Sequence, residues 1–238
     1  MYELNFMRLY EIDITLNGAT RTYVRLGGGL TGADPSQNEE VDQTGYLDGN
    51  GFKESRVTGK QLTISYSGHR KTGDAAQDYI AALEDETGDA LVTNFRMTDA
   101  VGNVKSGTCT LANIKSGGGD AGAKVEFTVD IHLNGKPTRT PHSTATALTA
   151  TVAPGTGAGC TKFTVTTPGA DNILAYKLKA ATQGTVYGNS YASEYITYTS
   201  GADIPAAVGQ YLCMYEIDPN KRVVKYLEQL LDSADFPV

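Results

Sequence analysis

The sequence lacks several features on which catalytic and metal-binding proteins commonly depend. Tryptophan is absent, and the three cysteines, Cys109, Cys160 and Cys213, lie far apart without a CxxC pair. This spacing disfavours both a zinc site and a disulfide framework. Small buried thiols in a reducing compartment are therefore the expected state of these residues.

Motifs for covalent and phosphate chemistry are missing as well. The three histidines stand in unrelated contexts, and no GxSxG nucleophile elbow accompanies them. Neither Gly59-Lys60 nor Gly135-Lys136 completes a phosphate-binding loop. The stretch DGNGFKE, which starts at Asp48, fails as a calcium loop because a phenylalanine and a glycine fall at ligand positions. The sequence therefore predicts a protein that is not an enzyme and holds no metal or cofactor.

Charge and apolar runs disfavour two further classes. The chain carries 20 Lys and Arg against 27 Asp and Glu, a net charge of −7, so no basic surplus is available to neutralise nucleic-acid phosphates. No apolar run approaches the roughly 20 residues that span a bilayer. The N-terminal residues alternate like a strand instead of forming a signal-peptide run. We expect a protein without a membrane segment that is not exported by the usual route.

Alternating strands are what the sequence does contain. In AKVEFTVDIHL (123–133) apolar residues occupy one face and polar residues the other. RLYEIDITL (8–16) alternates in the same way, and NGAT (17–20) predicts a hairpin turn into TYVRL (22–26). Further strands are predicted at 62–67, 90–99 and 102–114. One face of the resulting sheet should cover a core and the other should be wet.

One short helix interrupts these strands. Asp74 is a candidate N-cap, with Gln77 three residues later in a capping-box arrangement, and Gly88 is expected to end the helix. Because so short a helix is unstable alone in water, its apolar face is expected to pack on the sheet. That face comprises Ala76, Tyr79, Ile80 and Leu83.

From Gly27 to Gly51 the apolar period disappears. GGGLTGADPSQNEEVDQTGYLDGNG is rich in glycine and acidic residues, and we predict a long polar loop. A loop of this length in a compact domain is either a working part or disordered.

The second half of the chain predicts a separate domain. Pro137 and Pro141 among serines and threonines indicate an extended connector. Short strands with turns every 8–12 residues follow, which is typical of an immunoglobulin-like or fibronectin-like sandwich. The predicted organisation is a domain at 1–140, a linker at 141–145 and an Ig-like domain at 146–238.

The stretch TGYLDGNGFKESRVTGKQLTISYSGHRKTGDAAQDYIAAL (44–83) resembles phage major tail proteins, the tail tube subunits of long-tailed, non-contractile (siphophage-type) bacteriophages. The order of elements is also similar: a strand hairpin, a long loop, a strand, one helix and further strands. The resemblance covers about residues 1–140. Residues 146–238 resemble the Ig-like accessory domains of some tail tube proteins.

This resemblance implies a fold and an assembly. The fold would be mainly β: a tail-tube β-sandwich with one flanking helix and a long loop, followed by an Ig-like β-sandwich. Copies would self-assemble as hexameric rings that stack into the tube of a virion tail, and double-stranded DNA would pass through it without specific binding. Other partners would be the tape measure, tail terminator and distal tail proteins. The protein would be made in the host cytoplasm.

The resemblance also implies two sets of working residues. The long loop would be an arm that orders on an adjacent subunit, with the candidates Asp34, Glu39, Glu40, Asp42, Tyr46, Asp48 and Phe52. Acidic residues on polar strand faces would line the channel and repel DNA, and the candidates are Glu11, Asp13, Glu126 and Asp130. Ordinary solvated residues are the alternative reading of these four acids.

Three other functions are weighed against this one. The tube protein of a contractile injection machine would have the same kind of fold, and a sheath gene next to this one would favour that function. A surface or adhesion protein built from Ig-like modules is a second alternative, disfavoured by the missing secretion signal and by the unequal patterns of the two halves. An enzyme is the third, and no cluster of reactive groups favours it.

Overall fold

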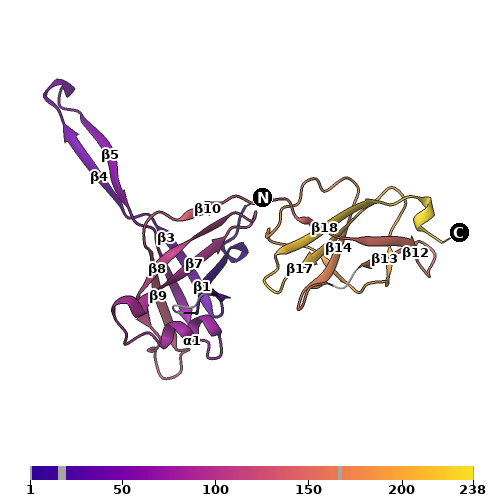
Figure 1. Cartoon of the computed structure of the whole chain (residues 1–238), viewed down its shortest axis with the longest axis horizontal. Helices are drawn as coiled ribbons and strands as arrows, with labels where there is room; N and C mark the ends of the chain where they lie inside the picture. Colours follow the sequence, from indigo (N-terminus) through magenta and orange to yellow (C-terminus); the bar gives the residue numbers. More distant parts are fainter. Residues whose placement is uncertain (1, 16–19, 166–167, 238) are drawn as a thin grey trace. The chain divides into compact units, whose positions relative to one another are not determined.

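The computed structural model describes residues 2–15, 20–165 and 168–237 and is mainly β, which confirms the predicted fold class (Figure 1). The chain divides into two compact units. The first, here called the sheet unit, comprises Leu9–Met97 and Lys105–Arg139. The second, the C-terminal unit, comprises Met1–Arg8, Thr98–Val104 and Thr140–Val238. The predicted division at residues 140 and 146 stays a prediction, and two short earlier segments group with the C-terminal unit.

An eight-stranded sheet forms the sheet unit. Seven of its strands run in the order β2-β1-β7-β8-β9-β6-β3, and β10 pairs with β8. The strands are β1 (Leu9–Asp13), β2 (Tyr23–Arg25), β3 (Leu30–Ser36), β6 (Thr63–His69), β7 (Val92–Thr98), β8 (Val104–Lys115), β9 (Glu126–Leu133) and β10 (Thr138–Thr140). β1 and β2 pair antiparallel, as the hairpin prediction requires. The predicted turn at 17–20 lies outside the described residues except for Thr20.

Alternation along β9 separates two faces of this sheet. Phe127, Val129 and Ile131 are fully buried, whereas Thr128 and Asp130 on the opposite face are half-buried. Neighbouring strands continue the buried face with Tyr10, Ile12, Ile64, Tyr66, Phe95, Met97, Cys109 and Leu111. The sheet therefore has one face on a hydrophobic core and one polar face, as antiparallel sheets commonly do.

Helix α1 (Ala75–Ala81) packs on the apolar face, and it is the one α-helix of the described residues (Figure 1). The Asp74 side chain accepts a hydrogen bond from Gln77 N at 3.1 Å, as the predicted cap requires. Ala76 and Ile80 are fully buried, and Tyr79 with Leu83 packs against the same core. The helix ends earlier than predicted, and the 3-10 turn η3 (Gly88–Leu91) leads into β7.

The stretch predicted to be a long polar loop is largely strand, so that prediction is wrong. β3 lies in the main sheet, and β4 (Glu39–Gly45) forms a separate hairpin with β5 (Lys53–Lys60). The 3-10 turn η2 (Leu47–Gly49) joins β4 to β5. This hairpin extends away from the main sheet (Figure 1). Both of its faces are exposed, so no alternation of apolar and polar residues marked it as strand.

Two sheets form the body of the C-terminal unit. The five-stranded sheet has the order β11-β18-β17-β14-β15 and the three-stranded sheet β12-β13-β16. Their strands are β11 (Thr146–Ala147), β12 (Ala150–Pro154), β13 (Cys160–Val165), β14 (Ile173–Lys179), β15 (Ile196–Tyr198), β16 (Asp203–Pro205), β17 (Tyr211–Ile217) and β18 (Val223–Leu230). Phe163 and Ile204 of one sheet share a buried cluster with Leu174 and Met214 of the other. The predicted sandwich is therefore present, and η4 (Ser233–Asp235) follows β18.

Arg222 ties the two earlier segments into this unit. Its side chain is almost fully buried and donates hydrogen bonds to Met7 O at 2.5 Å and Asp99 O at 2.9 Å. The guanidinium also lies 5.6 Å from the centre of the Tyr191 ring. The 3-10 turn η1 (Asn5–Met7) belongs to the first of these segments. A buried guanidinium held by carbonyl oxygens fixes the chain segments that supply them.

Candidate functional site

The β4–β5 hairpin, Glu39–Lys60, is here called the arm, and its tip is apolar. Leu47 is completely exposed, Phe52 is 82% exposed and Tyr46 is 57% exposed. Asn50 and Gly51 close the tip in left-handed conformations, with φ values of 50° and 87°. These conformations suit asparagine and glycine and fix a tight turn. The turn holds three large apolar side chains in water at the end of the hairpin.

The stem of the arm is paired but has no core of its own. Val41 and Val57 stand directly opposite each other and are both about half exposed. Near the base, Lys60 Nζ forms a salt bridge with Glu39 Oε1 at 2.6 Å. An isolated two-stranded hairpin is marginally stable in water. Contiguous exposed apolar residues commonly mark a contact surface. The arm is therefore the strongest candidate contact element of the sheet unit.

The predicted arm residues do not all lie on the arm. The structure places six of the seven on it: Glu39, Glu40, Asp42, Tyr46, Asp48 and Phe52. Asp34 instead lies on β3, opposite Ser65 of β6, and its assignment to a loop is corrected. Sequence reasoning missed Leu47, Val41 and Val57, although an apolar residue inside a polar stretch was the available signal.

The polar face of the main sheet carries a network of paired charges. Arg96 Nε and Nη2 donate to the two Glu11 carboxylate oxygens at 2.6 and 2.8 Å. The Arg96 guanidinium also lies 4.4 Å from the centre of the Tyr23 ring. The hydrogen bond from Glu11 raises the pKa of Arg96, and burial opposes this rise. A bidentate pair of this kind holds both side chains in fixed positions.

The prediction that Glu11 and Asp13 lie on a solvent-facing surface is corrected. Glu11 is 6% exposed and Asp13 is 1% exposed. Asp13 Oδ1 accepts hydrogen bonds from the backbone N–H groups of Thr15 and Thr22, both at 3.0 Å. Asn94 donates to its other oxygen at 3.0 Å. Asp13 therefore joins the end of β1 to the residues before β2. Neighbouring polar groups cover both Glu11 and Asp13.

Glu126 and Asp130 remain accessible on the polar face. Glu126 forms a salt bridge with Lys115, and that hydrogen bond lowers the pKa of Glu126. Burial of Asp130 raises its pKa, but hydrogen bonds from Asn113 and Ser65 outweigh burial and leave the pKa lowered. Both acids are therefore ionised at neutral pH. Each of these two accessible anions therefore lies beside a hydrogen-bonding partner on this face.

The main sheet ends in two edge strands. β2 ends the strand order on one side and β3 on the other, so each has a sheet neighbour on one side only. Edge strands present backbone groups that can pair with another chain. The β3 edge is mostly exposed and lies directly before the arm in the sequence. An edge and an arm thus adjoin each other along the chain.

Reactive groups are not gathered elsewhere in the described part of the chain. Its residues contain no group of three or more His, Cys, Asp or Glu that could hold a metal ion. Burial raises the pKa of Cys109 to about 12 and also raises the pKa of Cys213, so both thiols stay protonated at neutral pH. None of the described helices has the length and apolar character needed to cross a membrane.

These features define a mainly β protein whose candidate functional surfaces are contact surfaces. The family described as the C-terminal domain of the S-layer protein SbsC matches residues 153–234, about a third of the chain. That match lies within the C-terminal unit and leaves the sheet unit uncovered. No curated protein matches the sequence.

Two solved structures are similar to parts of the chain. The crystal structure of domains 7, 8 and 9 of the S-layer protein SbsC is 21% identical, covering 58% of this chain and 39% of its own, with a TM-score of 0.40. The tail of an empty GTA particle, with C6 symmetry, is 18% identical, covering 59% of this chain and 100% of its own, with a TM-score of 0.48. At these TM-scores neither likeness carries an argument about fold or function. None of these names mentions a catalytic activity.

Proposed function

We propose that this protein is a structural subunit that assembles into a tube, as the tail tube protein of a long-tailed, non-contractile phage. The observation that carries the proposal is the arm, which extends away from the main sheet (Figure 1) and exposes Tyr46, Leu47 and Phe52 at its tip. The resemblance of residues 44–83 to phage major tail proteins falls mainly on the arm and on α1.

The arm supplies the contact energy in this proposal. Burying each of Tyr46, Leu47 and Phe52 against a neighbouring copy contributes roughly 1.5–3 kcal/mol. The cost of ordering the hairpin and of losing free rotation reduces this gain. A single arm contact is therefore modest, and a closed ring of copies multiplies it.

The main sheet supplies the wall. The edges of β2 and β3 pair with the edges of adjacent copies, so that hexameric rings close a continuous sheet around a bore. The apolar face packs under α1, and the polar face lines the bore with Glu126 and Asp130 as the acids nearest the passing DNA. Anions held beside their partners do not grip duplex phosphates, and DNA slides through during ejection.

The wider setting follows from the same proposal. The tube is part of a virion tail made in the host cytoplasm, and its ends meet the tape measure, tail terminator and distal tail proteins. The C-terminal unit is an Ig-like accessory domain of this subunit. The tube of a contractile injection machine would use the same surfaces, and a neighbouring sheath gene would distinguish it.

Electron microscopy of the purified full-length chain tests the proposal. We expect negative-stain images to show rings or hollow tubes that grow with concentration and time. A single compact particle at every concentration, under all solution conditions tried, would contradict it.

A second candidate function rests on the C-terminal unit. The match of residues 153–234 to an S-layer domain favours a subunit of a surface array. The same images separate the two functions, because a surface array forms flat lattices and a tail protein forms tubes.

A further inference from the structure

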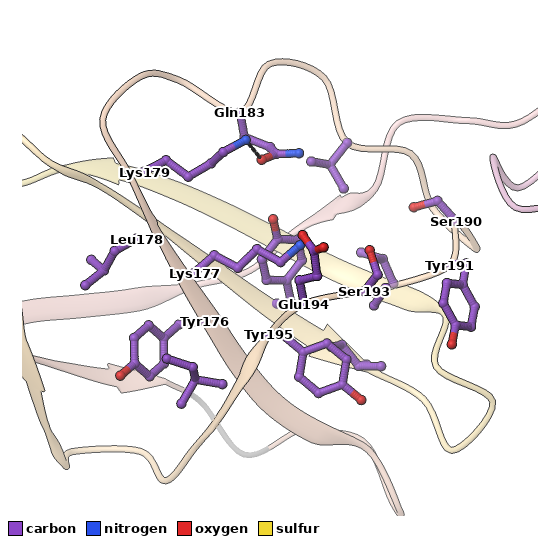
Figure 2. A pocket seen from close by; sticks show the side chains of 16 residues that line it. Tyr176, Lys177, Leu178, Lys179, Gln183, Ser190, Tyr191, Ser193, Glu194 and Tyr195 are labelled. Carbon is purple, nitrogen blue, oxygen red and sulfur yellow. Dashed lines mark hydrogen bonds between the residues drawn. The ribbon is translucent and has the colours of Figure 1, made fainter. Parts of the chain in front are cut away.

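A cavity of about 680 Å³ lies within the C-terminal unit, between strand β14 and the segment 180–195 (Figure 2). This sixteen-residue segment joins β14 to β15 and contains no strand that belongs to a sheet. Connections of this length inside a compact domain are uncommon and are usually either functional or disordered. Cavities of roughly 300–1,000 Å³ are the size that small ligands occupy.

The outer wall of the cavity is held in place. Asn189 N donates to Val223 O at 2.8 Å, and Ala192 N donates to Lys221 O at 2.8 Å. Arg222 Nη1 donates to Asn189 O at 3.3 Å. These bonds attach the segment 180–195 to the start of β18. The cavity is therefore preformed, which lowers the cost of ordering a ligand inside it.

Tyrosine rings form part of the lining, beside aliphatic side chains. Tyr191, Tyr195 and Tyr215 border the cavity, and Figure 2 labels the first two beside it. Tyr176 also touches the cavity, but its ring is buried in the cluster between the two sheets, edge-on to Tyr198. A tyrosine offers a flat apolar ring and a hydroxyl that both donates and accepts hydrogen bonds. Ser193 and other polar side chains border the same space. The lining suits a compact ligand that has flat C–H faces and many hydroxyl groups.

The charges in the cavity are unbalanced. Lys177 and Lys179 face one acid, Glu194. Lys179 Nζ donates to Gln183 Oε1, as the dashed line in Figure 2 shows. Among the described residues Lys177 forms no salt bridge, and its ammonium lies 5.9 Å from the centre of the Tyr215 ring. The ammonium of Lys177 is thus the cation that an anionic ligand could reach.

Burial supports this view of Lys177. Loss of water lowers its pKa, Lys179 lowers it further, and Glu194 opposes both effects. Burial therefore disfavours the charged form of Lys177 more than Glu194 favours it. Glu194 adopts a left-handed backbone conformation with φ of 54°, and its carboxylate is drawn toward the middle of the cavity (Figure 2). A strained residue of this kind commonly marks a binding site.

We propose that this cavity binds a carboxylate-bearing pyranose sugar. The rings of Tyr191 and Tyr195 stack on the C–H faces of the pyranose, and the hydroxyls of the lining bond its edges. Lys177 pairs with the carboxylate of the ligand, and Glu194 accepts hydrogen bonds from the sugar hydroxyls. This inference rests on the C-terminal unit alone and does not depend on tube assembly.

Titration calorimetry of the full-length protein tests the inference. The probes are trigalacturonic acid, a neutral galactose trisaccharide, sodium acetate and a short polyglutamate peptide. We expect saturable binding of trigalacturonic acid, at least tenfold weaker binding of the neutral sugar, and no saturation by acetate. The affinity for the acidic sugar should fall as salt is added, because the contact with Lys177 is electrostatic.

Three variants sharpen the test. Lys177→Met keeps an unbranched side chain that is one atom shorter and removes the charge, and the affinity for trigalacturonic acid should fall at least tenfold. Glu194→Gln keeps an oxygen that accepts hydrogen bonds from the sugar but removes the negative charge that repels the carboxylate of the ligand, so the affinity should rise severalfold. Lys162→Met on β13 is the matched control, because Lys162 does not line the cavity, and its affinity should equal that of the unmodified protein.

Several results would overturn the inference. The first is binding of trigalacturonic acid that does not saturate. The second is equal affinity for the neutral and the acidic sugar. The third is an affinity of Lys177→Met for trigalacturonic acid equal to that of Lys162→Met. Tighter binding of the polyglutamate peptide than of the sugar would identify a peptide site instead. Circular dichroism of each variant checks that a lost affinity does not reflect an unfolded domain.

Discussion

At the scale of single residues, two buried tyrosine hydroxyls have opposite surroundings. The Tyr66 hydroxyl is buried in the core of the sheet unit and has no hydrogen-bond partner within the described residues. The Tyr198 hydroxyl accepts from Phe163 N at 3.0 Å and lies 2.9 Å from Ala202 O. An unsatisfied buried polar group costs free energy, whereas a satisfied one contributes about 1 kcal/mol.

The same substitution should therefore change stability in opposite directions at these two positions. Tyr66→Phe should raise the free energy of unfolding of the sheet unit by about 1 kcal/mol, and Tyr198→Phe should lower that of the C-terminal unit by about 1–3 kcal/mol. Urea unfolding followed by a probe in each unit measures both values. A loss of stability in Tyr66→Phe would show that its hydroxyl has a partner in solution.

A buried carboxylate should make the C-terminal unit sensitive to acid. Glu216 is 1% exposed and accepts from Lys225 Nζ at 2.7 Å, Gly169 N at 2.9 Å and Asn172 Nδ2 at 2.7 Å. Burial raises its pKa, but these donors outweigh burial and leave the pKa lowered. The ionised form therefore stabilises the folded state above the unfolded pKa of about 4.3, and this contribution is lost as the pH falls through the lowered folded value.

Glu216→Gln tests this dependence. The variant should be less stable than the unmodified protein at pH 7, because the charge paired with Lys225 is lost. The difference should shrink as the pH falls from 5 to 3, since the carboxylate of the unmodified protein is then protonated. Urea unfolding at each pH measures it, and a difference that stays constant with pH would assign the effect to packing alone.

At the scale of elements, the strands with one buried face are those that the sequence identifies well. β9 falls inside the predicted strand at 123–133, because Phe127, Val129 and Ile131 alternate with polar residues. The cap at Asp74 and the start of α1 follow from local hydrogen bonding and are likewise readable. The arm was missed because both of its faces are exposed, which leaves no period to detect.

The sequence also did not predict which polar residues are buried or which residues distant along the chain are in contact. Glu11 alternates like a solvated residue, and only its pairing with Arg96, 85 positions away, explains why it is buried. The cavity in the C-terminal unit unites β14, β15, β17, β18 and an irregular segment. No spacing in the sequence indicates that Lys177 and Tyr191 share a site, because a loop without periodicity brings them together.

The arm itself makes the clearest prediction for an element. Replacing both Leu47 and Phe52 by serine should abolish assembly, because it removes the two most exposed apolar side chains of the tip. The thermal midpoint of the subunit should hardly change, since neither residue belongs to a core. Sedimentation velocity across a range of concentrations measures assembly.

A matched control accompanies this variant. Val208→Ser removes a side chain that is 61% exposed in the C-terminal unit, and it should assemble like the unmodified protein. Equal assembly of the arm variant and the control would remove the arm from the contact surface.

The polar face of the main sheet makes a second prediction at this scale. Tubes of the variant Glu126→Lys with Asp130→Lys should bind duplex DNA at low salt, because the accessible charge of the face is then basic. Tubes of the unmodified protein should not retain DNA. Filter binding with preformed tubes measures this, and equal retention by both would place the polar face outside the bore.

At the scale of the whole molecule, the two units have separate tasks in this account. The arm, the sheet edges and the polar face all belong to the sheet unit, and the cavity belongs to the C-terminal unit. A chain that ends at Ser143 loses Arg222 and therefore the hydrogen bonds to Met7 O and Asp99 O. It keeps every element that the proposed tube contact requires.

This truncated chain should therefore still form tubes, although residues 2–8 and 98–104 will be less ordered. A full-length chain in which a short Gly-Ser turn replaces Glu39–Lys60 is the opposite case and should stay monomeric. Negative-stain microscopy of both proteins distinguishes the tasks of the two units. Loss of tubes on truncation would make the C-terminal unit part of the wall.

Cryo-electron microscopy of the assembled full-length protein tests the central claim most directly. The account predicts a hollow bore lined by the polar face, with Leu47 and Phe52 of every arm buried against a neighbouring copy. A reconstruction in which the arm tips point into solvent, or in which α1 and not the polar face borders the bore, would contradict it.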